Sequence, residues 1–184
     1  MNQIEGFENA IEQTRSIVHG TAPADFDRAT PCPEWDVRAL VNHIIGGVRI
    51  AGDAATTGEG DISILEQDNI GADHVASYDD AARTAIDGWK QRGTDGTVKM
   101  FIGEMPVPVA FHVATSDVLV HGWDLARATG QSIDWNQAVA EDRLTTAKQM
   151  LKPEMRGDFF GPEVPAPPGA DSMTQLVAFF GRQP

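Results

Sequence analysis

Apolar residues recur along most of the chain at the spacing of amphipathic α-helices. The clearest pattern follows positions i, i+3, i+4, i+7, i+8 and i+11: Val37, Leu40, Val41, Ile44, Ile45 and Val48. This spacing places the apolar side chains in one stripe on a helix. Trp35 forms the entry, and Asp36 is suited to cap the first turn because a carboxylate accepts hydrogen bonds from free backbone amides. We therefore predict a helix from residue 37 onward.

The same spacing predicts further helices on both sides of this segment. The fourth helix is expected to end at Gly130, because glycine readily adopts the left-handed conformation that closes many helices. The fifth has Asp134 as its expected cap and Pro153 as its stop. Besides the helix that begins at residue 37, the predicted helices cover residues 4–18, about 78–92, 108–129, 136–151 and, as a short last helix, 172–182.

The segments between the helices are predicted to be irregular. Residues 21–36 contain three prolines, which remove backbone donors and fix φ, so this stretch is expected to form a long ordered loop. Residues 58–77, which include His74, are predicted to form a surface connection with a short turn. Residues 94–110 contain the β-leaning run "TVKMF" and predict a short extended piece or a β-hairpin. The Pro-rich residues 161–171 are expected to be extended.

Composition is that of an ordinary globular protein. The 184 residues suffice for one domain with a core, and we expect a single, predominantly all-α domain over residues 1–184. Apolar residues make up 41% and charged residues 22%, which indicates neither a disordered nor a fibrous class. Cys32 is the only cysteine, which excludes an internal disulfide and a multi-cysteine zinc site and agrees with a reducing compartment.

The chain is strongly acidic. Asp and Glu number 27 against 14 Lys and Arg, and the formal net charge is −13. Such a chain repels a phosphate backbone, so nucleic acid is not expected as a partner. The first residues lack a basic and apolar leader pattern, and no apolar run approaches the roughly 18 residues that a membrane span needs. We therefore expect a cytoplasmic protein without membrane association.

Side chains that can ligate a metal interrupt the apolar fourth helix. At about 100° per residue, Asp117, His121 and Asp124 fall within an arc of about 80° that otherwise carries alanines. Apolar side chains surround the rest of this helix, so it is expected to be buried, where an unpaired Asp or His costs several kcal/mol. Asp117 and His121 are four residues apart and can chelate one ion in a zinc-type site.

A third ligand is expected from another helix. His43 lies with small residues on a flank of the second helix, where a neighbouring helix can approach closely and a ligand sphere can fit. We therefore predict His43, Asp117 and His121 as the metal ligands. The other histidines are set aside because they lie at a helix end, in a loop and on the opposite face of the fourth helix: His19, His74 and His112.

Each of these residues also has a non-ligating interpretation. Asp and His four residues apart often form an ordinary polar pair on a helix, and His43 is compatible with a satisfied core histidine. Asp124 either accepts a hydrogen bond from a neighbouring loop or orients His121, with further ligation as a third option. Cys32 is interpreted as a packed loop residue rather than a nucleophile, because the sequence shows no cationic neighbour to lower its pKa.

The chain resembles a known family in three segments: "TPCPEWDVRALVNHIIGG", "DVLVHGWDLARATG" and "FFGRQP". They are similar to metal-binding proteins related to the mycothiol-dependent maleylpyruvate isomerases, a branch of the DinB-like superfamily. The match runs in order from the first helix to the last residues. The resemblance implies an up-down-down-up DinB-like four-helix bundle, here with extra short helices and the extended piece or β-hairpin.

The resemblance also implies a divalent metal site. One ligand comes from a histidine of the second helix and two from an acidic-x3-His pair of a later helix, which are His43, Asp117 and His121 here. Zinc is the favoured ion, with nickel or another divalent ion as alternatives. The isomerase has Glu where this chain has Asp117, one methylene shorter, so the ion is expected to sit nearer the helix. The isomerase's C-terminal domain is expected to be absent.

These observations predict a metal-dependent enzyme whose ion activates a small thiol or water. The specific form is a mycothiol-type transferase or isomerase, with a small-molecule substrate, a low-molecular-weight thiol as partner and, by family analogy, a homodimer. One alternative is a non-catalytic helical module that binds a metal or a small ligand. Another is a helical scaffold whose polar stripe holds only water. The sequence assigns the catalytic role to no residue.

Overall fold

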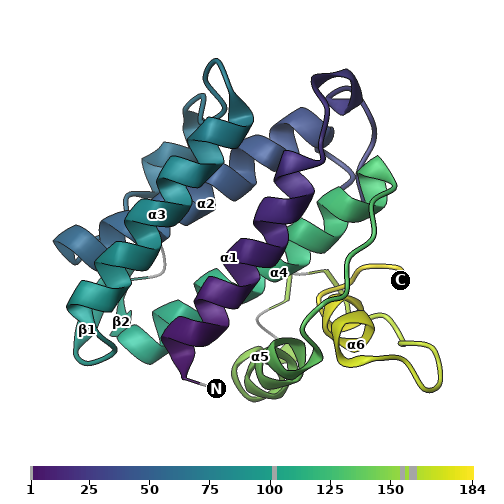
Figure 1. The fold of residues 1–184 in the computed structure, drawn as a ribbon. Helices are drawn as coiled ribbons and strands as arrows, with labels where there is room; N and C mark the ends of the chain where they lie inside the picture. Colours follow the sequence, from purple (N-terminus) through teal and green to yellow (C-terminus); the bar gives the residue numbers. More distant parts are fainter. Residues whose placement is uncertain (1, 101–102, 154–155, 158–160) are drawn as a thin grey trace. The chain divides into compact units, whose positions relative to one another are not determined.

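Helices dominate the computed structural model, which describes residues 2–100, 103–153, 156–157 and 161–184 (Figure 1). Contacts divide the chain into two compact units, Met1–Ser132 and Ile133–Pro184. A single domain over the whole chain therefore stays a prediction, and each unit is described by itself.

Four long helices form the first unit: α1 (Gln3–His19), α2 (Val37–Thr57), α3 (His74–Arg92) and α4 (Val107–Thr129). The main contacts join α1 to α3, α3 to α2, α2 to α4 and α4 to α1, which closes a four-helix bundle. Helices α1 and α4 run in one direction and α2 and α3 in the other, because residues 58–73 return along the bundle before α3 begins (Figure 1). The predicted up-down-down-up bundle is confirmed.

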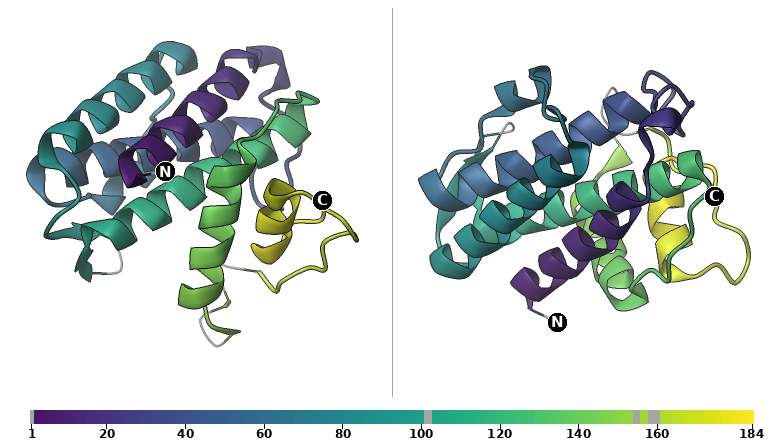
Figure 2. Two further views of the ribbon diagram at one scale, coloured as in Figure 1. Left: turned by 60° about the horizontal axis from the view of Figure 1, so that its bottom comes forward. Right: turned by 45° about the horizontal axis from the view of Figure 1, so that its top comes forward.

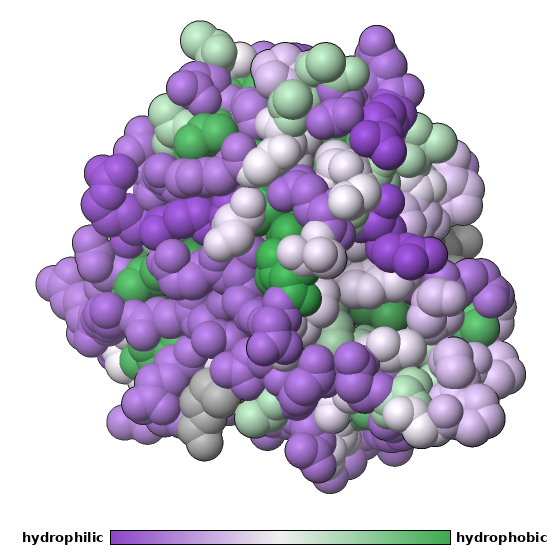
Figure 3. Space-filling model, turned by 45° about the vertical axis from the view of Figure 1, so that its right-hand side comes forward, coloured by the Kyte–Doolittle hydropathy of each residue, from purple (hydrophilic) through white to green (hydrophobic). Residues whose placement is uncertain are grey.

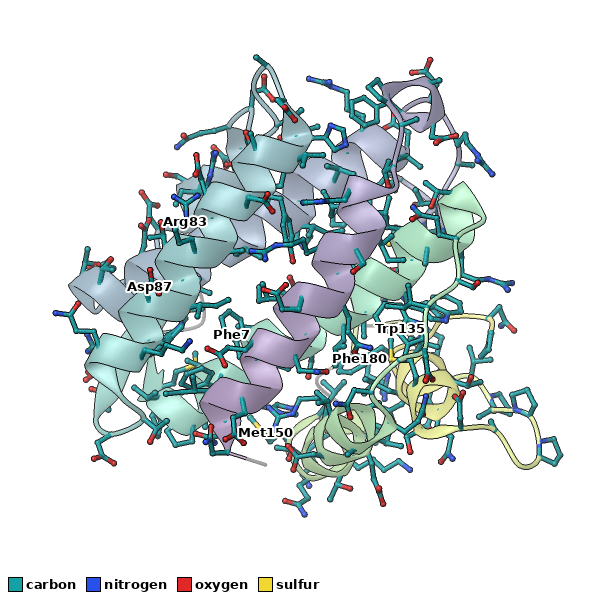
Figure 4. All side chains as sticks on the ribbon, in the orientation of Figure 1. Phe7, Arg83, Asp87, Trp135, Met150 and Phe180 are labelled. Carbon is teal, nitrogen blue, oxygen red and sulfur yellow. The ribbon has the colours of Figure 1, made fainter. Side chains whose placement is uncertain are left out.

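Aromatic and small residues set the packing inside this bundle. Phe7 of α1, labelled in Figure 4, is fully buried. Its ring lies 5.8 Å from that of Phe111, which in turn lies 4.6 Å from the ring of Trp89. Burying a side chain of this size stabilises the fold by about 1.5–3 kcal/mol. Gly122 lets α4 approach α1, because a Cβ at this position would collide with the Thr14 side chain.

Capping residues define the ends of several helices, and the start of the third helix differs from the prediction. Asp36 caps α2, as predicted, by accepting from the Ala39 amide at 2.8 Å. The third helix begins at His74 rather than near residue 78, because the Asp73 side chain caps its first turn. The prediction that His74 lies in a loop is therefore wrong. Gly130 closes α4 at φ 72°, as expected.

The connections include two short 3-10 turns, η1 (Pro23–Asp25) and η2 (Ile62–Glu66), within the stretches predicted to be irregular. After α3, β1 (Thr97–Met100) and β2 (Gly103–Pro106) pair antiparallel. This confirms the hairpin interpretation of "TVKMF", although its last residue, Phe101, lies outside the described residues.

The second unit contains α5 (Gln137–Met150) and α6 (Ser172–Phe179), which pack against each other (Figure 2). Asn136, not Asp134, caps α5, because its side chain accepts from the amides of the first turn. The predicted cap was therefore wrong by two positions, although the fifth helix itself is confirmed. The last helix ends earlier than predicted, at Phe179, and Gly181 follows with φ 87°.

The face drawn in Figure 3 is mostly hydrophilic, with apolar side chains in separate small patches. Among the described residues, Ile62 is the one large hydrophobic side chain classed as exposed, at 47%. Within the same residues, no helix combines the length and apolar character that crossing a membrane requires.

Candidate metal site

Two packed helices bring the predicted ligands together. His43 lies in the second turn of α2, and Asp117 and His121 lie one turn apart on α4. Helix α2 packs against α4, so residues that are 74 positions apart in the sequence become neighbours. All three side chains are partly buried, with exposed fractions of 19% for His43, 31% for Asp117 and 13% for His121.

The Asp117 carboxylate lies between the two imidazoles. Its Oδ1 is 3.4 Å from His43 Nε2 and 3.1 Å from His121 Nδ1. Donor atoms of the three residues all lie within 4.8 Å of one another. The spacing of four residues places Asp117 and His121 on the same face of α4, and the packing of α2 against that face adds His43 to the same cluster.

The cluster fits a divalent cation. Two donors on a tetrahedral zinc ion, each about 2.1 Å from it, lie about 3.4 Å apart. The donor separations of 3.4 Å and 3.1 Å around Asp117 Oδ1 are close to this value. Imidazole nitrogen with carboxylate oxygen is also a donor set that suits zinc, nickel and related ions. His43, Asp117 and His121 could thus hold such an ion without rearrangement of the helices.

Charge pairing is strong within the cluster. Burial opposes ionisation of Asp117, but the facing imidazoles of His121 and His43 outweigh it and hold the pKa of the carboxyl well below its usual range. Burial likewise opposes protonation of His121, but the Asp117 carboxylate outweighs it and raises the pKa of His121 to about 10. At neutral pH, the cluster is therefore an Asp117 carboxylate paired with an imidazolium, from which a cation must displace a proton.

The loop before α2 covers the imidazoles. The Trp35 ring lies 4.5 Å from the His43 ring and 5.6 Å from the His121 ring. The Thr30 hydroxyl holds this loop, because it lies 2.8 Å from the Trp35 carbonyl oxygen and accepts from the Cys32 amide at 3.1 Å. From the sequence, Trp35 was expected only to form the entry to the helix. Trp35 directly precedes the cap of α2, and His43 follows two helical turns later. This spacing could have indicated that the two side chains lie close together.

Cys32 is the second residue that sequence analysis missed. Its thiol donates to Asp124 Oδ2 at 3.3 Å and hydrogen-bonds His121, which helps to raise the pKa of that imidazole. The expectation that Cys32 has no cationic neighbour is therefore wrong. The neighbour comes from α4, far along the sequence, and spacing within the "PCP" segment cannot reveal it. Cys32 is only half-buried in the loop.

Asp124 lies beneath the cluster, one turn after His121 on α4. It is fully buried, and its charge also helps to raise the pKa of His121. A buried carboxylate beside a ligating imidazole is a common arrangement for orienting the ring. Asp124 accepts the hydrogen bond of the Cys32 thiol, which confirms the interpretation as a contact to a neighbouring loop, while the orienting role stays a prediction.

Two glycines on α2 explain why a helix with good apolar periodicity carries "GG". A Cβ on Gly47 would lie 2.9 Å from Asp117 Oδ2, so glycine leaves room for the carboxylate. A Cβ on Gly46 would instead lie 2.9 Å from the Leu65 side chain and 3.0 Å from that of Asn69. The low-bulk flank predicted for α2 thus receives the carboxylate on one side and residues 58–73 on the other.

The remaining histidines have positions away from the cluster. His19 Nε2 lies 2.9 Å from Asp79 Oδ1 at the end of α1, and the buried His74 lies 3.0 Å from the Thr21 carbonyl oxygen. His112 is buried within α4. Among the residues that the structure describes, none of these three belongs to a group of side chains able to hold a metal ion together.

Comparisons with known proteins relate the chain to one family. The family model described as the mycothiol maleylpyruvate isomerase N-terminal domain matches residues 7–126. Uncharacterised proteins from two strains of Mycobacterium tuberculosis are each 36% identical over 185 residues, which covers 99% of this chain and 98% of theirs. A crystal structure of a histidine-to-alanine mutant of the mycothiol-dependent maleylpyruvate isomerase aligns with a TM-score of 0.57 at 11% identity. That alignment covers 77% of this chain and 66% of the isomerase chain, and it shows a shared fold.

Proposed function

The chain belongs to the family of the mycothiol maleylpyruvate isomerase N-terminal domain, and on this premise we propose that it is a metal-dependent enzyme acting on a small thiol. In this proposal, His43, Asp117 and His121 hold a divalent ion. The reaction is a transfer or isomerisation that uses a low-molecular-weight thiol, with mycothiol as the specific candidate, or else an activated water.

One observation carries the proposal: the two imidazoles converge on Asp117 Oδ1 at the separations expected for donors on one ion. A divalent ion there would lower the pKa of a bound thiol or water, which supplies the nucleophile at neutral pH. Asp117 contributes the negative charge that favours cation binding. His43 and His121 contribute neutral donors once the proton on His121 has left.

Trp35 has a supporting role in this proposal. Its ring packs against both imidazoles, at 4.5 Å and 5.6 Å between ring centres, and so restricts their rotation. It also excludes water from that side of His43 and His121, which strengthens their interaction with Asp117. The loop that carries Trp35 thus forms one wall of the proposed binding site.

The substrate need not be that of the isomerase. Where the isomerase has Glu, this chain has Asp117, whose shorter side chain holds the carboxylate nearer α4. Gly47 provides the space on the facing helix. We propose that this shift changes the position of the ion and, with it, the substrate, while the use of a thiol is kept.

Metal analysis tests the first half of the proposal. The protein is purified without added metal and without a metal-binding tag, and bound ions are measured by mass spectrometry. We expect close to one equivalent in the wild type and a loss of about tenfold or more in affinity for His43→Ala and His121→Ala. His19→Ala is the matched control, because His19 pairs with Asp79 outside the cluster. A wild type that binds no divalent ion would refute the proposal.

Thiol-transfer assays test the second half. Metal-loaded wild type is incubated with small thiols, mycothiol among them, and electrophilic acceptors, and product formation is compared with that of His43→Ala and His121→Ala. We expect activity that both substitutions abolish and His19→Ala retains. Metal binding without any activity on thiols would instead favour the alternative, a non-catalytic module that binds a metal or small ligand.

Three further properties complete the proposal: zinc as the resident ion, a cytoplasmic location and a homodimer. Zinc is proposed because the imidazole and carboxylate donors suit it. Metal analysis identifies the ion, and light scattering at working concentration measures the mass in solution. A monomer mass would contradict the homodimer alone.

A further inference from the structure

His121 has ligating neighbours on two sides. On one side are Asp117 and His43, which form the cluster described above. On the other side are Cys32 and Asp124, whose donor atoms lie within 4.8 Å of each other and of a nitrogen of His121. The same imidazole thus belongs to two groups of three potential ligands, and the second group contains sulfur.

The second group also has the dimensions of a metal site. Sulfur and oxygen donors on one tetrahedral zinc ion, at about 2.3 Å and 2.1 Å from it, lie about 3.6 Å apart. Cys32 Sγ lies 3.3 Å from Asp124 Oδ2, which is close to that separation. The hydrogen bond between them contains the thiol proton, which a thiophilic cation displaces when it binds sulfur. Asp124 is fully buried and supplies the negative charge.

We propose that Cys32, His121 and Asp124 form a second cation site, selective for thiophilic ions, that competes with the first site for His121. Binding of the divalent ion forms bonds to sulfur, nitrogen and oxygen, and it releases to solvent both the Cys32 thiol proton and one proton of the His121 imidazolium. The two sites exclude each other, because a neutral imidazole has one nitrogen with a free lone pair. His121 Nδ1 faces Asp117, at 3.0 Å from its carbonyl oxygen and 3.1 Å from Oδ1.

The tautomer of His121 therefore decides which site is complete. When Nδ1 carries the proton, it donates to the Asp117 carbonyl oxygen, and the one remaining lone pair of the ring, on Nε2, is the one that a cation held by Cys32 and Asp124 would have to use. When Nδ1 is unprotonated, it joins Asp117 and His43 in the first site. A soft ion such as Cd²⁺ is expected at the sulfur-containing site, and a hard ion such as Mn²⁺ at the site without sulfur.

Titration with Cd²⁺ and Mn²⁺ tests the proposal. The ultraviolet charge-transfer absorbance of a cadmium–thiolate bond is specific here, because Cys32 is the only cysteine. We expect this absorbance in the wild type and in His43→Ala. Cys32→Ser should abolish it and weaken Cd²⁺ binding by about tenfold or more, while Mn²⁺ affinity changes by less than about twofold. In the wild type, saturating Mn²⁺ should raise the concentration of Cd²⁺ needed for the absorbance.

The variants keep the test independent of the proposed function. Cd²⁺ bound to the wild type without thiolate absorbance, or bound equally tightly to Cys32→Ser, would overturn the second site. Asp124→Asn, which keeps the shape of the side chain, should also weaken Cd²⁺ binding, and circular dichroism checks the fold of both variants. The first site has a separate readout, because His43→Ala should abolish Mn²⁺ binding. If His43→Ala still binds Mn²⁺, the proposed first site is wrong, but the cadmium–thiolate absorbance remains a valid test of the second site.

Discussion

Replacement of Gly47 by alanine should weaken metal binding without lowering the stability of the metal-free protein. Gly47 lies inside α2, where alanine is favoured over glycine by about 1 kcal/mol. The new Cβ, however, would lie 2.9 Å from Asp117 Oδ2, about half an ångström inside the 3.4 Å at which ordinary contact begins. The carboxylate must therefore move, whereas metal ligands tolerate shifts of only about 0.2 Å.

We expect Gly47→Ala to be at least as stable as the wild type without metal but to bind divalent ions about tenfold or more weakly, which corresponds to about 1.4 kcal/mol. Urea unfolding of the metal-free proteins measures the first quantity, and calorimetric titration with Zn²⁺ measures the second.

Gly46→Ala is the matched control for this experiment. It makes the same change on the next residue of the same helix, but its Cβ meets Leu65 and Asn69 instead of Asp117. We expect metal affinity within about twofold of the wild type, because the ligands keep their positions. Equal metal affinity of Gly47→Ala and the wild type would refute the reasoning. So would an equal loss of affinity in the two variants, since the effect would then come from α2 rather than from Asp117.

Three further predictions follow from the pKa shifts and the helix cap. The Asp117 carboxylate raises the pKa of His121 to about 10, so a cation that binds this imidazole displaces a proton. Zn²⁺ affinity should therefore rise by about tenfold per pH unit above neutrality. Calorimetry showing a pH-independent affinity would contradict this. Burial raises the pKa of Tyr78 above its ordinary 10.0, so stability present below pH 10 should fall as the pH rises further. Urea unfolding should show this fall in the wild type and not in Tyr78→Phe. Asp36→Ala removes the cap of α2 and should lower the free energy of unfolding by about 0.5–2 kcal/mol, measured in urea, and an unchanged midpoint would contradict the capping role.

Periodicity was sufficient to predict the four long helices and the face of α4 that carries Asp117 and His121. Both are local properties, because residues three or four apart lie on the same side of a helix. His43 was also predictable, since a histidine among small residues indicates a flank that another helix approaches. The structure adds the reason for the adjacent glycine: Gly47 faces an Asp117 oxygen.

Residues whose neighbours are distant in sequence were not predictable in this way. Cys32 lies in a loop, and its contacts with Asp124 and His121 depend on where α4 passes that loop. His74 was missed for a different reason. Apolar periodicity near the start of α3 is weak, and the Asp73 cap, rather than the apolar pattern, fixes where the helix begins.

The connection of residues 58–73 along the bundle has a consequence for the order of folding. His43 lies before this connection and Asp117 after it, so the two proposed ligands are 74 positions apart in the sequence and must be brought together by the packing of α2 against α4. Ligation is thus expected to form late, after the transition state. A bound cation should then slow unfolding while leaving the refolding rate nearly unchanged. Stopped-flow kinetics with and without Zn²⁺ would show whether the ion stabilises only the folded bundle or already assists its formation.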